Sequence, residues 1–171
     1  MGKGFIQVYT GNGKGKTTAA LGLSVRAVCA GKKVYFAQFV KGMKYSELEA
    51  VKYLPNFEME QFGRDTFIYK EAKQDDIDAA RIGLEKCRKI LQEGRHDIVV
   101  LDELNIALFY KLFTVKEAIE MIESRAENVE VIITGRNANQ AIIEIADLVT
   151  EMKEVKHYYS KGVEARLGIE K

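Results

Sequence analysis

The sequence has few of the residues that form disulfides, cysteine-based metal sites or flexible linkers. It contains two cysteines, Cys29 and Cys87, one proline and no tryptophan. So few cysteines, without a C-x-x-C spacing, exclude a disulfide scaffold and a zinc ribbon and favour a reducing compartment, so we expect a cytoplasmic protein. The lone proline, Pro55, and the lack of a serine-rich stretch indicate that there is no flexible linker. We therefore expect one domain over residues 1–171.

Long apolar runs and an excess of one charge are missing as well. The longest apolar run has five residues, Ile106 to Tyr110, whereas a membrane-spanning helix needs about 20. Because no charged and then apolar leader opens the chain, we expect neither a secretion signal nor a membrane partner. The 26 basic and 25 acidic side chains nearly balance. This balance argues against nucleic acid as a partner.

What the chain does contain is an alternation of short apolar runs and amphipathic segments. The runs predict strands, the third of them at a sheet edge, over 5–9, 34–40, 57–62, 98–101, 129–134 and 148–155. Helical spacing predicts helices over 19–30, 46–53, 77–91, 115–124 and 139–146. Ser46 and Glu49 have the spacing of a capping box. Since apolar strands that alternate with helices are typical of covered parallel sheets, we predict an α/β fold with helices on both faces.

A glycine-rich segment directly follows the first predicted strand. Residues 10–17 read TGNGKGKT, the Walker A pattern GxxxxGK[ST] except that Thr10 holds the first glycine position. Glycines let main-chain N–H groups converge on phosphate oxygens, and the next helix directs its positive end there. Lys14 and Lys16 would neutralise phosphate charge, and the Thr17 hydroxyl would bind Mg²⁺. The predicted nucleotide-binding residues are Gly11, Asn12, Gly13, Lys14, Gly15, Lys16, Thr17 and Thr18.

The alternative for this loop is a glycine-rich turn with solvated lysines, which the flanking strand and helix disfavour. If the loop binds phosphate, Lys16→Ala should cut turnover strongly. We expect that variant to keep its fold, because an exposed loop lysine contributes little to packing.

Two carboxylates end the predicted strand 98–101. Asp102 and Glu103 match a Walker B element, in which one carboxylate, directly or through water, completes the shell of a Mg²⁺ bound by Thr17. The sequence leaves open which of the two binds the metal, and an isolated pair of this kind could simply cap the next helix. Arg136, just beyond another strand, is placed to contact phosphate or to be an ordinary surface arginine.

The motif series, beyond its Walker elements, resembles the P-loop type ATP:corrinoid adenosyltransferases. The resemblance is carried in order by TGNGKGKTTAALG, AQFVKG, VVLDELNIAL, VIITGRNA, ADLVTEM and VKHYYSKGVEARLGIE, which span nearly the whole chain. It implies a RecA-like P-loop fold and a homodimer. It also implies transfer of the 5′-deoxyadenosyl group of ATP to the cobalt of cob(I)alamin or a related corrinoid, with release of triphosphate. An electron-donating flavoprotein reductase is the implied partner.

The implied chemistry needs no general base, because Co(I) carries a lone pair and no proton. The electrostatic task is to stabilise the departing triphosphate, and we expect Lys16, Lys14 and Glu103 to be the catalytic residues. His96 and His157, the two histidines, stand in no ligand-spaced cluster. The lack of an obvious acid–base pair therefore agrees with the resemblance.

The family binds its corrinoid with aromatic side chains after removal of the lower axial ligand. Phe67 and Tyr69 are the closest match to the family's Phe-x-Trp pair, and the alternative is core aromatics beside a loop. Because the glycine loop begins at residue 10, we expect no helix ahead of it to cover the site. Residues 155–171 are the candidate cover, and the alternative for them is a terminal strand and a frayed end.

Two other functions suit the same residues. In a RecA-like ATPase that hydrolyses the γ-phosphate, Glu103 would activate water. In a non-catalytic sensor of nucleotide or corrinoid, binding would occur without turnover. The products of the reaction discriminate among the three.

Overall fold

A parallel sheet organises the protein, seen in a computed structural model that describes residues 2–66, 68 and 71–171. The strands of this sheet are β1 (Ile6–Thr10), β2 (Val34–Phe39), β3 (Phe57–Phe62), β4 (Ile98–Asp102), β5 (Glu130–Thr134) and β6 (Leu148–Glu151). Their order is β3-β2-β4-β5-β1-β6, and every pairing is parallel. This confirms the predicted α/β class and its RecA-like P-loop arrangement.

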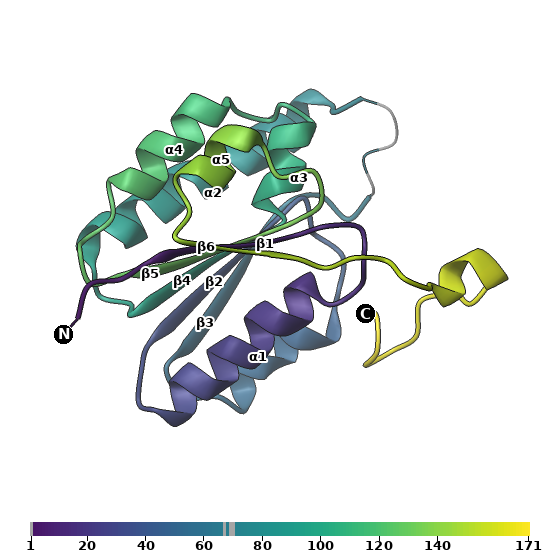
Figure 1. Cartoon of the computed structure of the whole chain (residues 1–171), viewed down its shortest axis with the longest axis horizontal. Helices are drawn as coiled ribbons and strands as arrows, with labels where there is room; N and C mark the ends of the chain where they lie inside the picture. The colour runs from purple at the N-terminus through teal and green to yellow at the C-terminus, as the bar shows by residue number, and fades with distance from the viewer. Residues whose placement is uncertain (1, 67, 69–70) are drawn as a thin grey trace.

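Helices cover both faces of the sheet, as predicted (Figure 1). They are α1 (Lys16–Cys29), α2 (Gln74–Glu93), α3 (Leu104–Phe109), α4 (Val115–Glu123) and α5 (Gln140–Glu144), with 3₁₀ helices η1 (Ser46–Lys52) and η2 (Tyr158–Lys161). The helix α1 lies on one face, and α2 to α5 lie on the other. Among the helices that the structure describes, none is both long and apolar enough to cross a membrane.

Alternating side chains of the strands build a core on each face. In β2, Val34 and Phe36 pack in the cluster that includes Ala20 and Ala27 of α1, while Tyr35 and neighbouring alternate residues join the larger cluster opposite. All six residues of β2 are buried. A strand covered on both faces must be apolar along its whole length, which is why the sequence shows a run there and no alternation.

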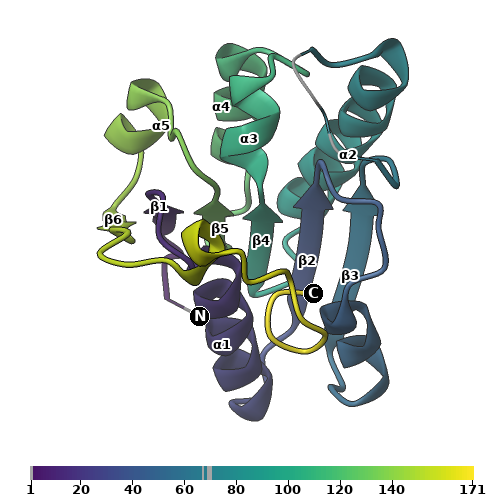
Figure 2. The same cartoon turned by 90° about the vertical axis from the view of Figure 1, so that its right-hand side faces the viewer.

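The edge strands differ from this pattern. The strand β3 lies at an edge, as its alternating sequence predicts, and β6 forms the other edge. The prediction of a strand over 148–155 was too long, because β6 ends at Glu151, and its four residues are all exposed. From there the chain leaves the sheet and crosses toward the start of α1 (Figure 2).

The predicted capping box at Ser46 and Glu49 was wrong. The segment is a 3₁₀ helix whose N-cap is Tyr45, without a side-chain cap hydrogen bond. The Ser46 hydroxyl instead donates to the main-chain oxygen of Lys171, 3.0 Å away. Ser46 therefore bonds to a residue 125 positions away in the sequence and does not form the local capping hydrogen bond that its spacing to Glu49 suggested.

Candidate active site

At the carboxyl edge of the sheet, each of four neighbouring strands is followed by a residue in the left-handed backbone conformation. The φ angles of the residues after β1, β2, β4 and β5 are 95° at Gly11, 60° at Val40, 59° at Glu103 and 128° at Gly135. Val40 and Glu103 have side chains, so this conformation costs about 1–3 kcal/mol each. Such strain is concentrated at functional sites, and in parallel sheets ligands bind beyond this edge.

A cavity of about 600 Å³ opens at the same edge, within the range of small-molecule sites. Its lining includes residues 13–18 at the start of α1 and the cationic side chains of Lys14, Lys16, Lys41 and Arg136. Of the predicted loop residues, Gly11 and Asn12 lie outside this lining. Glu47, Glu103 and Glu170 also line the cavity. The four cations suit it to a polyanion.

The N-terminus of α1 points into this cavity without any cap from the protein. Its N-cap residue is Gly15, which offers no side chain, and the first turn holds no acidic residue. The first N–H groups of a helix have no partner within the helix, and they carry the positive end of its dipole. The start of α1 is therefore an anion-binding position, as the loop pattern predicts.

Lys16 is buried, contrary to the expectation that it is an exposed loop lysine. Its side chain folds back so that Nζ donates to the carbonyl oxygens of Gly11 and Gly13, each 2.8 Å away. Burial lowers the pKa of Lys16, while Glu103 acts in the opposite direction. Because the ammonium holds two loop carbonyls, this lysine shapes the loop as well as carrying charge.

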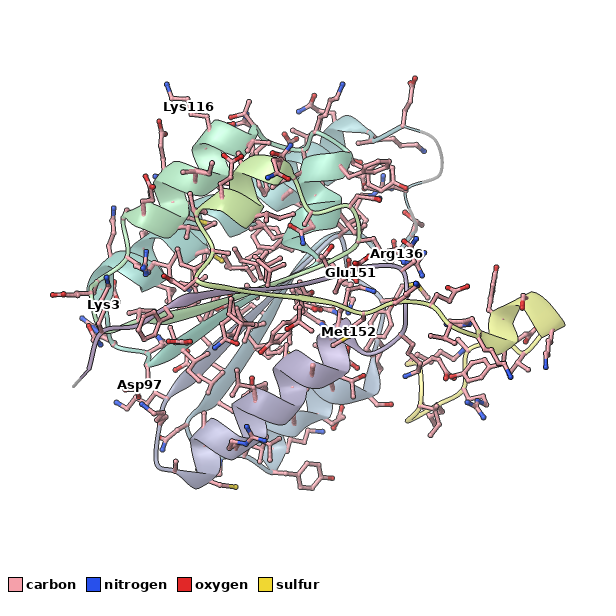
Figure 3. The ribbon with its side chains drawn as sticks, viewed as in Figure 1. Lys3, Asp97, Lys116, Arg136, Glu151 and Met152 are labelled. Atoms are coloured by element: carbon pink, nitrogen blue, oxygen red, sulfur yellow. The ribbon has the colours of Figure 1, made fainter. Side chains whose placement is uncertain are left out.

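The loop glycines also make room for the chain that follows β6. The N–H group of Gly13 donates to the carbonyl oxygen of Met152, 2.7 Å away. A Cβ at Gly11 would lie 2.5 Å from that oxygen, and one at Gly13 would lie 2.7 Å from it. Figure 3 shows Met152 beside the start of α1. The N–H group of Gly13 is therefore engaged by the chain that follows β6.

Thr10 stands where the Walker A pattern has glycine because it is still a strand residue. It is the last residue of β1, and the first left-handed residue is Gly11. The Thr10 hydroxyl lies 3.4 Å from the main-chain nitrogen of Ala138. The departure from the pattern thus costs no backbone strain.

Asp102 is completely buried and is held by hydrogen bonds to both carboxylate oxygens. Its Oδ1 accepts from the hydroxyls of Thr17 at 2.8 Å and Thr134 at 2.6 Å. Its Oδ2 accepts from Gln38 Nε2 at 3.2 Å and Lys41 Nζ at 2.8 Å. With both oxygens engaged, Asp102 positions the first turn of α1 through Thr17.

Glu103 is the second carboxylate at this point. Its main-chain N–H donates to the hydroxyl of Thr134, 3.0 Å away. Burial and the charge of Asp102 raise the pKa of Glu103, whereas Lys41, Lys16 and Arg136 act to lower it. A Cβ at Gly135 would lie 3.3 Å from Oε2 of Glu103. The glycine after β5 thus leaves space for this carboxylate at the cavity wall.

The oxygen donors at this point fit a magnesium ion that a nucleotide brings with it. The Thr17 hydroxyl gives its proton to Asp102 and keeps its lone pairs, and the Glu103 carboxylate, which lines the same cavity, would offer a second oxygen. No group of three or more His, Cys, Asp or Glu side chains that could hold a metal occurs in the described part of the chain. Mg²⁺ typically takes one or two carboxylates plus substrate phosphates, so two protein oxygens suit it.

The C-terminal segment, the predicted candidate cover, contributes to the cavity lining, and in Figure 2 it passes in front of α1. Residues 168–171 line the cavity, and Lys14 Nζ donates to the carbonyl oxygen of Ile169, 3.0 Å away. His157 also contributes to the lining. Tyr158, Arg166 and Glu170 hold the segment together, with Arg166 Nη2 3.2 Å from the Glu170 carboxylate.

Arg136 and the predicted aromatic pair have different outcomes. Arg136 is exposed and lines the cavity; Figure 3 labels it at the end of the sheet where β5 leaves. Phe67 and Tyr69 lie outside the described residues. Ile68, between them, accepts a hydrogen bond on its carbonyl oxygen from the Tyr110 hydroxyl at 3.3 Å.

Several contacts of the site could not be inferred from the sequence, although the residues that make them stand in the motifs that carry the family resemblance. Lys41, Gln38 and Thr134 reach Asp102 from neighbouring strands, and Met152 reaches the loop from β6. The alternate glycines at 11, 13 and 15 indicate that another group comes close to the loop backbone, but they do not identify that group. The other residues lie near strand ends, where position alone selects no partner.

A glycine loop between β1 and α1, joined through Thr17 to a buried acid at the end of β4, defines an α/β protein of the RecA-like P-loop class. Within that class the sequence matches the family described as ATP:corrinoid adenosyltransferase BtuR/CobO/CobP over residues 2–170. The chain belongs to this family.

Individual relatives agree with this membership. The corrinoid adenosyltransferase of Escherichia coli strain K12 is 36% identical over 168 residues, which cover 98% of this chain and 86% of the relative. The corrinoid adenosyltransferase CobA of Salmonella typhimurium is 35% identical over 98% of this chain and 86% of its own. The corrinoid adenosyltransferase of a Sinorhizobium species is 36% identical over 98% of this chain and 80% of its own.

Proposed function

We propose that the protein transfers the 5′-deoxyadenosyl group of ATP to the cobalt of cob(I)alamin or a related corrinoid, and releases triphosphate. The observation that carries the proposal is the uncapped, acid-free N-terminus of α1 in a cationic cavity, in a chain of the ATP:corrinoid adenosyltransferase family.

In this reaction the Co(I) electron pair attacks the ribose C5′ carbon and forms the Co–C bond. The C5′–O bond breaks, and its electron pair leaves with the triphosphate, so cobalt is formally oxidised to Co(III). No proton is transferred, and no side chain has to act as a base. The protein accelerates the reaction by positioning C5′ in line with cobalt and by stabilising the charge that develops on the triphosphate.

The residues at the start of α1 perform the second task in this proposal. The free N–H groups of the first turn and the charge of Lys16 bind the polyphosphate, and Lys14 and Arg136 add charge from the cavity wall. The Lys14 ammonium donates a hydrogen bond to the carbonyl oxygen of Ile169. ATP would therefore compete with the C-terminal segment for Lys14.

We further propose that Mg²⁺ binds with ATP, held directly by Thr17 and Glu103, with Asp102 orienting Thr17 from behind. This assigns the direct ligand to Glu103 because both oxygens of Asp102 already accept two hydrogen bonds each. When bound, the ion would neutralise charge on the departing triphosphate.

Two further expectations, a single domain and a cytoplasmic location, rest on the length of the chain and its few cysteines. The homodimer, the electron-donating flavoprotein reductase as partner and a corrinoid contact through Phe67 and Tyr69 rest on the family resemblance.

The test is to incubate the protein with ATP, Mg²⁺ and chemically reduced cobalamin and to identify the products. We expect adenosylcobalamin by its absorption spectrum and intact triphosphate by anion-exchange chromatography, in equal amounts. ADP and phosphate as the main products would replace the proposal with a hydrolase. Binding of both substrates without turnover would replace it with a sensor.

A further inference from the structure

Lys41 lies between the buried acid of the site and the cavity. Its Nζ donates a 2.8 Å hydrogen bond to Oδ2 of Asp102, and its side chain lines the same cavity as Lys16. The Lys41 side chain is 15% exposed, whereas that of Asp102 is fully buried. The ammonium group also lies 3.9 Å from Oε1 of Glu47 and 5.1 Å from the centre of the Tyr45 ring, and it borders the cavity.

The backbone around Lys41 is strained and tightly clamped. Val40 has a φ of 60°, a region that a β-branched residue rarely adopts. A Cβ at Gly63 would lie 2.5 Å from the main-chain nitrogen of Lys41, and one at Gly42 would lie 2.4 Å from the carbonyl carbon of Arg64. Strain of this kind persists where the surroundings force it, which is typical of residues placed for function.

Asp102 keeps hydrogen-bond partners on both oxygens even without Lys41. Thr17 and Thr134 serve Oδ1, and Gln38 serves Oδ2. A carboxylate with three remaining donors stays satisfied if a fourth departs, so long as another cation compensates its charge. Lys41 is therefore able to exchange its partner when a polyphosphate enters the cavity together with its magnesium ion, which compensates the charge of Asp102.

Three cations from separate elements border the same cavity. Lys41, Lys16 and Arg136 all line it. These cations follow β2, β1 and β5, which the sheet brings to the same edge. A converging set of cations of this kind is suited to a ligand that carries several negative charges.

We propose that Lys41 is a third lysine of the triphosphate site and that its ammonium exchanges Asp102 for a phosphate oxygen when ATP binds. The inference rests on the proposed function, since it assumes that the polyphosphate enters this cavity. It gives Lys41 a role different from that of Lys16. Lys16 is fixed to the loop carbonyls, whereas Lys41 approaches from β2 and links substrate binding to the buried acid.

The test is to measure binding of inorganic triphosphate by calorimetry, with Mg²⁺ at a constant saturating concentration and without corrinoid. We expect Lys41→Met to weaken binding at least about tenfold, because a hydrogen bond to a charged group is lost. Lys44→Met, an exposed lysine outside the cavity lining, is the matched control and should bind as the wild type does. Equal affinity of Lys41→Met and wild type would overturn the inference and leave the proposed function standing. A wild type that fails to bind triphosphate would overturn both.

A second pair of variants separates phosphate binding from a purely structural ion pair. Removing Lys41 alone leaves Asp102 as an unpaired buried charge, so Lys41→Met could fail to fold. Asp102→Asn removes that charge, and Lys41→Met in the Asp102→Asn background should bind triphosphate at least about tenfold more weakly than Asp102→Asn alone. Equal affinities in this pair would show that Lys41 serves only Asp102, and the inference would be wrong.

Discussion

The starts of α1 and α4 show how the same helix geometry is used in two ways. At α4 the Thr114 hydroxyl accepts from the main-chain N–H of Glu117 at 3.1 Å, and the Glu117 carboxylate accepts from the N–H of Thr114 at 2.7 Å. At α1 the N-cap is Gly15, and neither a capping side chain nor an acid is present. One helix satisfies its own first turn, and the other leaves it unsatisfied.

The missing cap at α1 shows where the protein forgoes free energy of folding. A side-chain N-cap typically contributes about 1 kcal/mol, and an acid in the first turn adds a favourable interaction with the helix dipole. At α1 these contributions are forgone, and a buried lysine is placed beside the positive end of the helix instead. An anionic ligand is what makes that arrangement favourable, so α1 is built for binding and α4 for folding.

The strongest test of this difference between α1 and α4 is to replace one lysine in the first turn of each helix. Lys16→Ala should lower adenosyl transfer about 100- to 1000-fold, because a preorganised donor to the departing triphosphate is lost. Lys116→Ala, in the first turn of α4 with its side chain 86% exposed, should change turnover less than about twofold. Steady-state rates with saturating ATP check both. Equal rates for the two variants would contradict the assigned role of α1.

The hydroxyl of Thr17 gives the next largest effect. Thr17→Val keeps the shape of the side chain but removes the oxygen that links α1 to Asp102 and to the proposed metal. We expect the Mg²⁺ concentration for half-maximal turnover to rise about 10- to 100-fold. Thr17→Ser retains the hydroxyl and should stay near the wild type. An unchanged Mg²⁺ requirement in Thr17→Val would remove Thr17 from the metal site.

Removing the cap of α4 should lower the stability of the protein and leave its turnover unchanged. Thr114→Ala should lower the free energy of unfolding by about 1 kcal/mol and the melting temperature by about 2–4 °C. Turnover at 25 °C should be unchanged, because α4 lies away from the cavity lining. Calorimetry and the adenosyl-transfer assay measure the two quantities. A variant with normal stability but impaired turnover would reverse the division between the helices.

The smallest effect is a pH dependence confined to α4. Hydrogen bonds from the main-chain N–H and hydroxyl of Thr114 lower the pKa of Glu117 below its usual 4.5. For an acid whose pKa is lower in the folded state, the stabilisation is present above 4.5 and is lost as the pH falls through the folded-state pKa. The stability difference between wild type and Glu117→Gln should therefore shrink on acidification. Urea unfolding at a series of pH values measures it, and a constant difference would exclude a role for the charge.

The sequence predicts the class of fold well because strands that are covered on both faces must be apolar throughout. The runs at 34–40 and 98–101 were read correctly as buried strands, and the stripe through Leu84 and Leu91 marks the buried face of α2. The apolar run that begins at Ile106 gave no such signal, and the short helix α3 was missed. The predicted capping box at Ser46 and Glu49 was wrong because the spacing of the two residues is a local feature, whereas the hydrogen-bond partner of Ser46 is distant in the sequence.

The chemical residue types of the site were likewise available in the sequence, but their contacts were not. The glycine loop, Lys16, Thr17 and the Asp102–Glu103 pair follow from a pattern in which every member is close in the chain. The burial of Lys16, the engagement of the Gly13 N–H by Met152 and the position of Lys41 depend on other strands. No local pattern encodes which strand end lies beside which.

The sequence by itself determined that this is an α/β protein with a phosphate-binding loop of the corrinoid adenosyltransferase family, because strand and helix periodicity and the loop motif are properties of neighbouring residues. Only the tertiary structure decided the order β3-β2-β4-β5-β1-β6, and with it the meeting of Lys41, Thr17 and Thr134 at Asp102. The physical reason is that a parallel sheet brings the carboxyl ends of distant segments to one edge, and burial there gives each charge a partner that sequence distance does not reveal.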